Sequence, residues 1–300
     1  MTDIERVGVV GCGLMGAGIA EVCARAGVPV TVVERDAEAA RAGRLRIDRS
    51  LDRALAHGRL DAGRREAAAA LITVVDQLEA LHDRDLVIEA VAEDEGLKLD
   101  VFRRLDAVLT GDRTVLATNT SSIPVIRLAT ATGCPERVVG VHFFNPVPVL
   151  RLVELVPSLL TSPATAARAE DFVTRTLGKE VVRTRDKAGF IVNALLVPYL
   201  LAAVRMVETG SATAVDIDRA MALGCAHPLG PLALADLIGL DTTRAIAESL
   251  YAEFREPQYS PPPLLSRMVE AGLLGRKSGR GFHTYDAVPR PEAAAPAGTG

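Results

Sequence analysis

The first residues with types and spacing suited to chemistry form a glycine-rich loop. Residues 11–16 (GCGLMG) follow an apolar run and open a segment whose apolar residues recur at helical spacing. In this pattern Gly11 permits a tight turn, Gly13 lets a pyrophosphate approach the backbone, and Gly16 lets the helix pack closely on the strand. Free N–H groups and a partial positive charge at the start of the helix favour phosphate there. The loop therefore predicts a dinucleotide-binding site.

An acidic residue lies at the distance that such a fold requires. Glu34 ends a second apolar run, residues 28–33, and 34 − 13 = 21 residues separate it from Gly13, close to the roughly 20 expected. Its carboxylate would accept hydrogen bonds from the adenosine ribose and repel a 2′-phosphate, which favours NAD over NADP. Arg35 leaves that choice open, and Asp36 competes as the ribose ligand although it lies past the strand end. The alternative is a dinucleotide fold with a decayed site.

A histidine at a later strand end could move a proton. His142 lies in the apolar run 138–144, at the end where ligands bind in open α/β sheets. An enzyme that oxidises an alcohol needs a base of this kind. Glu154 lies in the next apolar run, 152–156, and pairing with His142 would offset its desolvation and fix the imidazole tautomer. The alternatives are a structural histidine and a glutamate bound by backbone amides or placed on an edge strand.

A hydroxyl-rich segment follows another predicted strand. Residues 118–122 (TNTSS) come directly after the apolar run 115–117. The segment reads either as a turn or helix cap before Pro124, or as a set of hydroxyl groups that hold a substrate oxygen.

The elements that must position these residues alternate between strand and helix. The β-rich runs 72–75, 86–89, 115–117 and 138–144 are separated by helical segments, and βαβ units build parallel sheets with right-handed crossovers. The predicted fold class is α/β, a Rossmann-type doubly wound sheet followed by an all-helical C-terminal domain. We predict the following organisation: a dinucleotide-binding domain over 1–186 with a helical hairpin at about 37–70, a helical domain over 187–285, and a disordered tail over 286–300.

The composition excludes several classes of function. The 300 residues carry 34 Lys and Arg against 38 Asp and Glu, a net charge of −4, which predicts no nucleic-acid partner. The longest apolar stretch is interrupted by polar residues, so no membrane span is predicted, nor is a secretory signal. The four cysteines have no metal-binding spacing, which favours reduced thiols in a cytoplasmic protein without a metal. Only 4% of the residues are aromatic, so few rings can stack on a ligand.

Over roughly residues 5–285 the sequence resembles the 3-hydroxyacyl-CoA dehydrogenases, in particular the short-chain 3-hydroxybutyryl-CoA enzymes. The resemblance rests on these motifs in the family's order: GCGLMGAGIA (11–20), LVIEAVAE (86–93), NTSS (119–122), HFFNPVP (142–148), GFIVN (189–193), HPLGP (227–231) and GRKSGRGF (275–282). It implies reversible NAD-dependent oxidation of an (S)-3-hydroxyacyl-CoA, with short chains favoured. It also implies a homodimer formed through the helical domain.

The resemblance assigns roles residue by residue. His142 matches the base that takes the 3-hydroxyl proton and Glu154 the residue that orients it, while Ser121 and Asn193 match contacts to the reacting part of the substrate. Asn193 would place the active site in the cleft between the two domains. The implied cofactor-binding residues are Gly11, Gly13, Leu14, Met15, Gly16, Glu34, Glu93, Lys98, Asn119, Ser121 and Lys277, and the implied CoA contacts are Ser50 and Arg53, with Arg59 as a further candidate.

Three departures and two rival functions accompany the resemblance. His57 stands where relatives often have Lys, Thr118 where they have Ser, and His283 where they have an aromatic residue; the first of these weakens the case for a phosphate contact on the hairpin. The rivals are a dehydrogenase of a free hydroxy acid, of the gulonate or carnitine type, and a non-catalytic NAD-binding protein resembling a lens crystallin.

Overall fold

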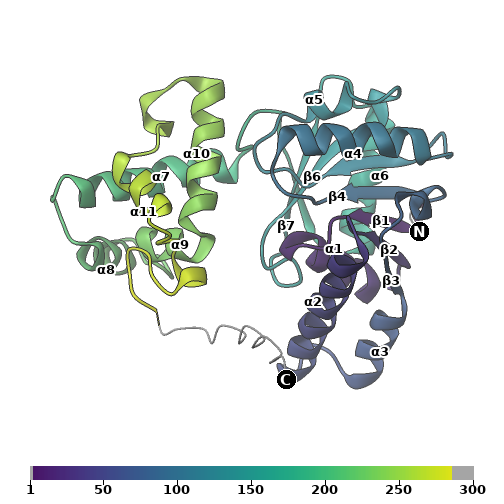
Figure 1. Cartoon of the computed structure of the whole chain (residues 1–300), viewed down its shortest axis with the longest axis horizontal. Coiled ribbons are helices and arrows are strands. Elements are labelled where there is room, and N and C mark those ends of the chain that lie inside the picture. The colour runs from purple at the N-terminus through teal and green to yellow at the C-terminus, as the bar shows by residue number, and fades with distance from the viewer. Residues whose placement is uncertain (1–2, 286–300) are drawn as a thin grey trace, which may run out of the picture. The chain divides into compact units, whose positions relative to one another are not determined.

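The protein divides into two compact units in this computed structural model, which describes residues 3–285. One unit extends to Ile191 and the other begins at Val192 (Figure 1). The tail predicted over 286–300 lies outside the described residues.

The first unit is built on a single sheet of eight strands in the order β3-β2-β1-β4-β5-β6-β7-β8. All neighbouring strands are parallel except β6 and β7, which are antiparallel. The chain reverses its direction of travel across the sheet between β1 and β4, the switch point at which ligands bind in folds of this kind. The strands are β1 Val7–Val10, β2 Val30–Val33, β3 Ile72–Val75, β4 Leu86–Glu89, β5 Val115–Thr118, β6 Val138–Phe143, β7 Leu152–Pro157 and β8 Glu180–Arg183.

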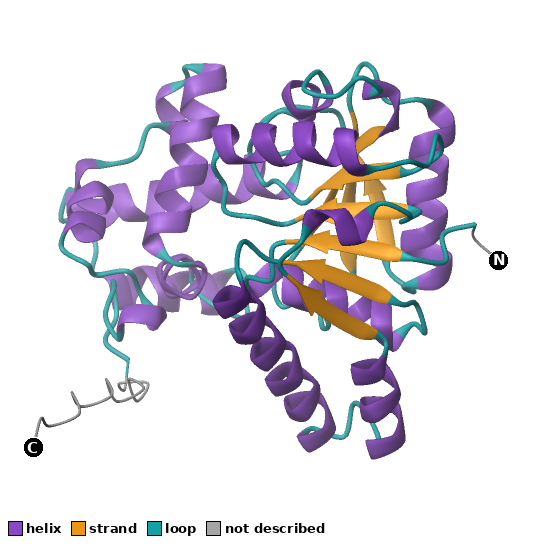
Figure 2. Cartoon of the chain, turned by 45° about the vertical axis from the view of Figure 1, so that its right-hand side comes forward, coloured by secondary structure: helices purple, strands orange, loops and turns teal. Residues whose placement is uncertain are grey.

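Helices cover both faces of the sheet, as Figure 2 shows. Alternate strand residues point to opposite faces, so each face has its own apolar core. One core packs against α1 (Leu14–Arg25), α2 (Ala37–Ala56), α3 (Ala62–Ala70) and α6 (Pro163–Asp171). The other packs against α4 (Glu95–Val108) and α5 (Val125–Ala129). The central parallel strands β1, β4 and β5 are buried along their whole length, which explains their apolar runs, whereas β3 and β8 at the two edges are partly exposed.

Helices α2 and α3 lie side by side beyond the edge strand β3 (Figure 1). Each begins at an aspartate whose side chain accepts an N–H of the first turn, Asp36 for α2 and Asp61 for α3. Arg44 links α2 to both α3 and the edge strand β3. Its guanidinium donates to the carbonyl oxygen of Ile72, the first residue of β3, at 2.7 Å and to that of Ala69 in α3 at 3.2 Å.

The second unit is helical. Its helices are α7 Val192–Glu208, α8 Ala214–Gly224, α9 Pro231–Ile238, α10 Leu240–Phe254 and α11 Pro263–Glu270. Asp236 in α9 accepts the N–H groups of Phe282 and His283 at 3.0 and 2.9 Å and so binds the segment that ends the described chain. The predicted fold class, a Rossmann-type sheet followed by a helical domain, is confirmed. Between residues 3 and 285 no helix has both the length and the apolar character that a membrane span needs.

Candidate active site

The glycine loop joins the end of β1 to the start of α1 and is shaped by its own backbone. Gly11 has φ +92°, and a Cβ atom there would lie 2.8 Å from the carbonyl oxygen of Ala90. A Cβ on Gly16 would lie 1.9 Å from the carbonyl oxygen of Gly11, so this glycine lets the helix approach the loop. Gly13 differs, because a Cβ there would meet nothing within 4 Å. The open side of Gly13 is therefore the side on which a ligand can approach the backbone.

Glu34 closes the loop from the end of β2. Its Oε1 accepts the N–H of Cys12 at 2.6 Å, and its Oε2 accepts the N–H of Arg35 at 3.1 Å. Asp36 is engaged elsewhere, because its Oδ1 accepts the N–H of Ala39 at 2.7 Å and its Oδ2 pairs with Arg35 at 3.1 Å. This arrangement favours Glu34 over Asp36 as the carboxylate that faces a ribose.

A cavity of about 380 Å³ lies between the carboxyl ends of β1, β2 and β4, at the switch point. It is lined by the loop glycines Gly11 and Gly13, by Glu34, and by apolar side chains that include Val10 and Leu97. Its charged lining residues besides Glu34 are Arg35, Asp76, Asp100 and Arg104. Open backbone, apolar walls and a carboxylate at the end of β2 are what the adenosine and pyrophosphate of a dinucleotide require. The residues present therefore fit NAD.

Two further groups of the loop region were not singled out by the sequence. Arg46 on α2 donates from Nη1 to the carbonyl oxygen of Cys12 and so ties the hairpin to the loop. Cys12 is fully buried, and burial raises the pKa of its thiol to about 12, to which the nearby Glu34 carboxylate contributes. The thiol therefore stays protonated and has a packing role.

His142 and Glu154 face each other across β6 and β7, where they are paired in the antiparallel register. His142 Nδ1 lies 2.8 Å from Glu154 Oε2, and both side chains are almost completely buried. Ser121 Oγ lies 3.2 Å from the other ring nitrogen, Nε2. Since a carboxylate only accepts, Nδ1 is the protonated nitrogen and Nε2 is available to receive a proton. The structure thus brings together three of the residues predicted from the sequence.

The imidazole is held by packing as well as by hydrogen bonds. The rings of Phe144 and Phe190 lie 4.6 and 5.5 Å from it, centroid to centroid. Phe190 has φ +50°, an uncommon conformation for a residue with a side chain. Next to it, Ile191 donates its N–H to Glu154 Oε1 at 3.0 Å. Both carboxylate oxygens of Glu154 are therefore engaged, which fixes the orientation of the pair.

The segment that carries Ser121 is held by Glu93. A single oxygen of Glu93, Oε1, accepts the N–H groups of Ser121 and Ser122 at 2.8 and 3.0 Å and the hydroxyl of Thr120 at 2.6 Å. Burial opposes ionisation of Glu93, but the Lys98 ammonium and these hydrogen bonds outweigh it and hold the pKa of the carboxyl below its usual range. Glu93 is therefore a charged acceptor at this turn.

Lys98 and Asn119 are both buried in the structure. Lys98 Nζ donates to Glu89 Oε1 at 2.6 Å and lies 3.3 Å from Glu93 Oε2. Asn119 Oδ1 accepts the N–H of Phe143 at 2.8 Å and so joins the ends of β5 and β6. Glu89 was not recognised as a site residue in the sequence, where it reads as the last residue of an apolar strand.

The remaining predicted residues lie elsewhere. Leu14 and Met15 begin α1, with Leu14 exposed. Ser50 and Arg53 lie on α2, which packs on α1 and on the edge strand β3. Strands β2, β1, β4 and β5 separate β3 from β6 in the sheet. Asn193, in the first turn of α7, and Lys277 belong to the second unit. There Lys277 donates to Asp241 at 2.6 Å, and this bond offsets the effect of burial and lowers the pKa of the Asp241 carboxyl.

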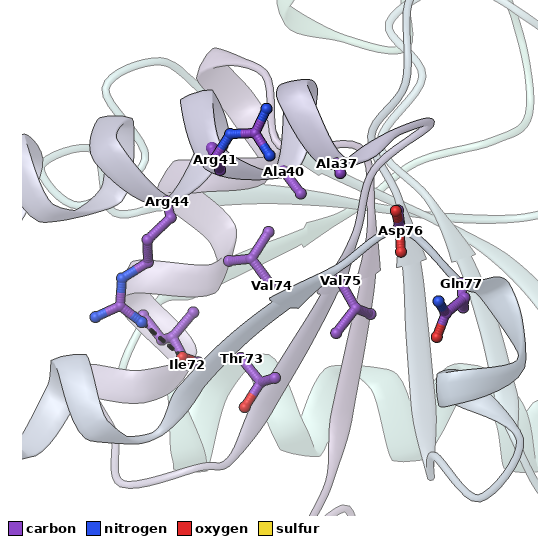
Figure 3. Close-up of a pocket in the computed structure, with 10 residues that line it drawn as sticks. All are labelled: Ala37, Ala40, Arg41, Arg44, Ile72, Thr73, Val74, Val75, Asp76 and Gln77. Atoms are coloured by element: carbon purple, nitrogen blue, oxygen red, sulfur yellow. Dashed lines mark hydrogen bonds between the residues drawn. The ribbon is translucent and has the colours of Figure 1, made fainter.

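A larger hollow, about 680 Å³, lies away from these groups between α2 and β3. Figure 3 shows that Arg44, one of the two arginines that line it, is already bonded to Ile72. The rest of its lining combines Ala, Val and Ile side chains with Arg41, Thr73, Asp76 and Gln77. Asp76 also lines the switch-point cavity, but this hollow has neither the glycine loop nor the Glu34 carboxylate of that cavity.

The fold and the site together define a class of protein. A glycine loop and an acidic strand end at the switch point, with a histidine–carboxylate pair at the end of β6, are the parts of a nicotinamide-dependent dehydrogenase. The chain belongs to the 3-hydroxyacyl-CoA dehydrogenase family: the family's NAD binding domain matches residues 6–187 and its C-terminal domain matches residues 189–285. The predicted resemblance and the predicted cofactor, NAD, are confirmed.

Individual relatives agree with this assignment. A 3-hydroxybutyryl-CoA dehydrogenase of Mycobacterium tuberculosis is 59% identical over 286 residues, which cover 95% of this chain and 100% of the relative. The crystal structure of FadB2 from M. tuberculosis superposes with a TM-score of 0.93 at 59% identity, covering 94% of this chain and 99% of that one. The (S)-3-hydroxybutyryl-CoA dehydrogenase PaaH1 of Ralstonia eutropha has a TM-score of 0.88 at 42% identity, covering 95% and 100% of the two chains.

Two glycine substitutions should separate folding from cofactor binding. Gly16→Ala forces a methyl group into the Gly11 carbonyl, so we expect a lower Tm and weaker NADH binding, with overpacking costing about 1–3 kcal/mol. Gly13→Ala has room for its methyl group and an ordinary φ of −64°. It should keep the wild-type Tm and still raise the NADH Kd about 10-fold or more, since the methyl would occupy the pyrophosphate's approach. Thermal melts and fluorescence titration with NADH measure both; wild-type NADH affinity in Gly13→Ala would contradict this role.

Proposed function

We propose that this protein is an NAD-dependent dehydrogenase that interconverts short-chain (S)-3-hydroxyacyl-CoA and 3-oxoacyl-CoA, with 3-hydroxybutyryl-CoA as the characteristic substrate. The observation that carries the proposal is the line of Glu154, His142 and Ser121, joined by contacts of 2.8 and 3.2 Å. It is supported by the names of the relatives that match this chain over almost its whole length.

In the oxidative direction His142 Nε2 receives the proton of the 3-hydroxyl group, and in the reductive direction it returns that proton. The Glu154 carboxylate keeps Nδ1 protonated and stabilises the imidazolium that forms. Burial of the pair strengthens this interaction, because little water competes for either group. The Ser121 hydroxyl, beside Nε2, holds the substrate oxygen in line with the base.

The cofactor would lie along the carboxyl ends of the central strands. Gly11, Gly13, Leu14, Met15 and Gly16 would hold its pyrophosphate, and Glu34 its adenosine ribose. When bound, NAD supplies the hydride acceptor, C4 of the nicotinamide. We propose that Glu93, Lys98, Asn119 and Ser121 contact the nicotinamide half of the cofactor. Lys277 would contact the cofactor from the helical domain.

The substrate would take contacts from both domains. Asn193, at the start of the helical domain, would hydrogen-bond the reacting group of the substrate, as Ser121 would from the first domain. Ser50 and Arg53 on the hairpin would meet the CoA moiety. Arg53 is exposed on α2, and its guanidinium suits the phosphates of CoA.

The decisive experiment compares acetoacetyl-CoA with free acetoacetate as oxidants of NADH. We expect kcat/KM to be at least about 100-fold higher for the CoA ester, since contacts remote from the reacting carbon contribute to transition-state binding. A series of acyl chain lengths should peak at the short end. Arg53→Gln should raise KM for acetoacetyl-CoA, whereas Arg64→Gln on the neighbouring helix α3 serves as the control. Equal turnover of the free acid, or no turnover of either compound, would refute the proposal.

Two broader assignments accompany this function. We propose that the protein is a homodimer formed through its helical domain and that it acts in the cytoplasm. Exposed apolar side chains of that domain, among them Leu195, Val215 and Leu223, support such an interface. Light scattering at micromolar concentration should report the mass of two chains; a monomer would contradict the assembly.

A further inference from the structure

A chain of buried polar groups connects the end of β4 to the segment that carries Ser121. Glu89 and Lys98 have relative exposures of 0% and 1%, and their charged groups are 2.6 Å apart. Lys98 lies 3.3 Å from Glu93 Oε2, while the other oxygen of Glu93 receives the N–H groups of Ser121 and Ser122. One ammonium is therefore shared between two carboxylates, and the second of these holds the catalytic turn.

We propose that Glu89 and Lys98 are positioning residues for the active site. Their ion pair anchors one oxygen of Glu93, so that the other oxygen holds the 120–122 turn and keeps Ser121 next to His142. The inference rests on the proposed function, because it assigns the pair a part in the turnover of that site.

The charges of Lys98 and Glu93 are exposed to different degrees. With a relative exposure of 1%, the Lys98 side chain is surrounded by protein, whereas the side chain of Glu93 is 33% exposed. Whatever contact Lys98 makes to the cofactor, its ammonium is also bound to both carboxylates of the network. Lys98 supplies the charge that keeps the partly exposed Glu93 carboxylate ionised and fixed in place.

A second arm of the network reaches the same turn from the other side. Glu89 and Thr118 face each other in the register of β4 and β5. The Thr118 hydroxyl donates to Glu89 Oε2 at 2.7 Å and accepts the N–H of Thr120 at 3.1 Å. The turn is thus tied to the buried ion pair through Thr118 at its start and through Glu93 along its length.

Stability alone does not account for such a pair. A buried ion pair loses the hydration of both groups, and an apolar pair of similar volume often stabilises a fold equally well. What an apolar pair cannot supply is a fixed anchor for a third charged group. Because a displacement of about 1 Å at a reacting group can lower turnover up to about 100-fold, such an anchor has a direct effect on rate.

The test uses single variants and their neutral double variant in the full-length protein. Lys98→Met leaves the buried Glu89 carboxylate without its cation, and Glu89→Gln leaves the Lys98 ammonium with Glu93 as its one charged partner in the network. Both changes should lower Tm and reduce kcat for acetoacetyl-CoA with NADH by about 10-fold. KM for acetoacetyl-CoA should change less than about threefold, since the substrate contacts remain. The double variant Glu89→Gln/Lys98→Met removes both charges, so it should recover most of the Tm while kcat stays low.

Two matched sets of variants complete the design. Glu21→Gln removes another buried carboxylate of the first unit, whose cation partner is Arg25 at 3.1 Å on α1; it should alter Tm and leave kcat unchanged. Thr118→Val should lower kcat at nearly constant volume, and Thr118→Ser should restore it. This second set keeps the inference testable if the ion-pair variants fail to fold.

Recovery of kcat together with Tm in the double variant would overturn the inference, as would a Thr118→Val enzyme with wild-type kcat. Failure of the proposed function is a separate result, because wild-type protein would then not reduce acetoacetyl-CoA at all. The inference would also be overturned if Glu21→Gln lowered kcat as much as Glu89→Gln does. Loss of any buried carboxylate in the first unit would then explain the effect.

Discussion

Replacing His142 by Gln is expected to lower kcat at least about 100-fold in both directions, the contribution of a positioned general acid–base group. The amide cannot take up or release a proton during turnover. It can still donate to Glu154, which in the wild type accepts from His142 at 2.8 Å, so the buried carboxylate keeps a partner. The side chain also fits between Phe144 and Phe190. We therefore expect a wild-type fold and a nearly unchanged NADH Kd.

Stopped-flow reduction of acetoacetyl-CoA, thermal melts and fluorescence titration with NADH measure these three quantities. His57→Gln is the matched control, because His57 is exposed at the end of α2 and bonds only its own helix, through Arg53. It should retain wild-type kcat. A His142→Gln enzyme that retains kcat within about 10-fold of wild type would exclude His142 as the proton-transfer group.

The parts of the site that depend on neighbours along the chain could be predicted from the sequence. The 11–16 loop needs only a strand before it and a helix after it, and Glu34 is located by its distance from Gly13. His142 could be selected because a strand end in an open α/β sheet is a place for ligands. The same holds for the fold class, since alternating strands and helices leave few topologies.

The parts that depend on tertiary packing could not be predicted. Nothing in the run 86–89 distinguishes Glu89 from an ordinary strand end, yet it is the centre of a buried network. Lys98 is a helical lysine nine residues later, 98 − 89 = 9, and it is buried because α4 packs on the sheet and brings it against Glu89 at the end of β4. Arg46 likewise reads as one of many arginines on α2. Its contact with the Cys12 carbonyl arises only when the hairpin packs on the loop.

The antiparallel direction of β7 was also not contained in the local pattern. Apolar runs predict strands without their direction. The reversal between β6 and β7 is what places Glu154 directly opposite His142. From the sequence, the pair is favoured because a partner offsets the desolvation of Glu154. The register supplies the geometric reason that the two side chains meet.

The second large effect is expected for Glu154→Gln, which should lower the plateau kcat by about 100-fold or more. The amide oxygen can still accept the N–H of Ile191, which Glu154 Oε1 accepts at 3.0 Å, so the chain should fold. The amide NH₂ would then face Nδ1 and donate to it, which places the imidazole proton on Nε2. That tautomer cannot receive the substrate proton.

A matched variant distinguishes this role from the general loss of a carboxylate in the sheet. Glu180→Gln removes a carboxylate from the neighbouring strand β8, where it pairs with Arg151, and it should retain wild-type kcat. Thermal melts and stopped-flow reduction of acetoacetyl-CoA measure both variants. A Glu154→Gln enzyme that folds and keeps kcat within about 10-fold of wild type would show that the carboxylate does not set the imidazole tautomer for proton transfer.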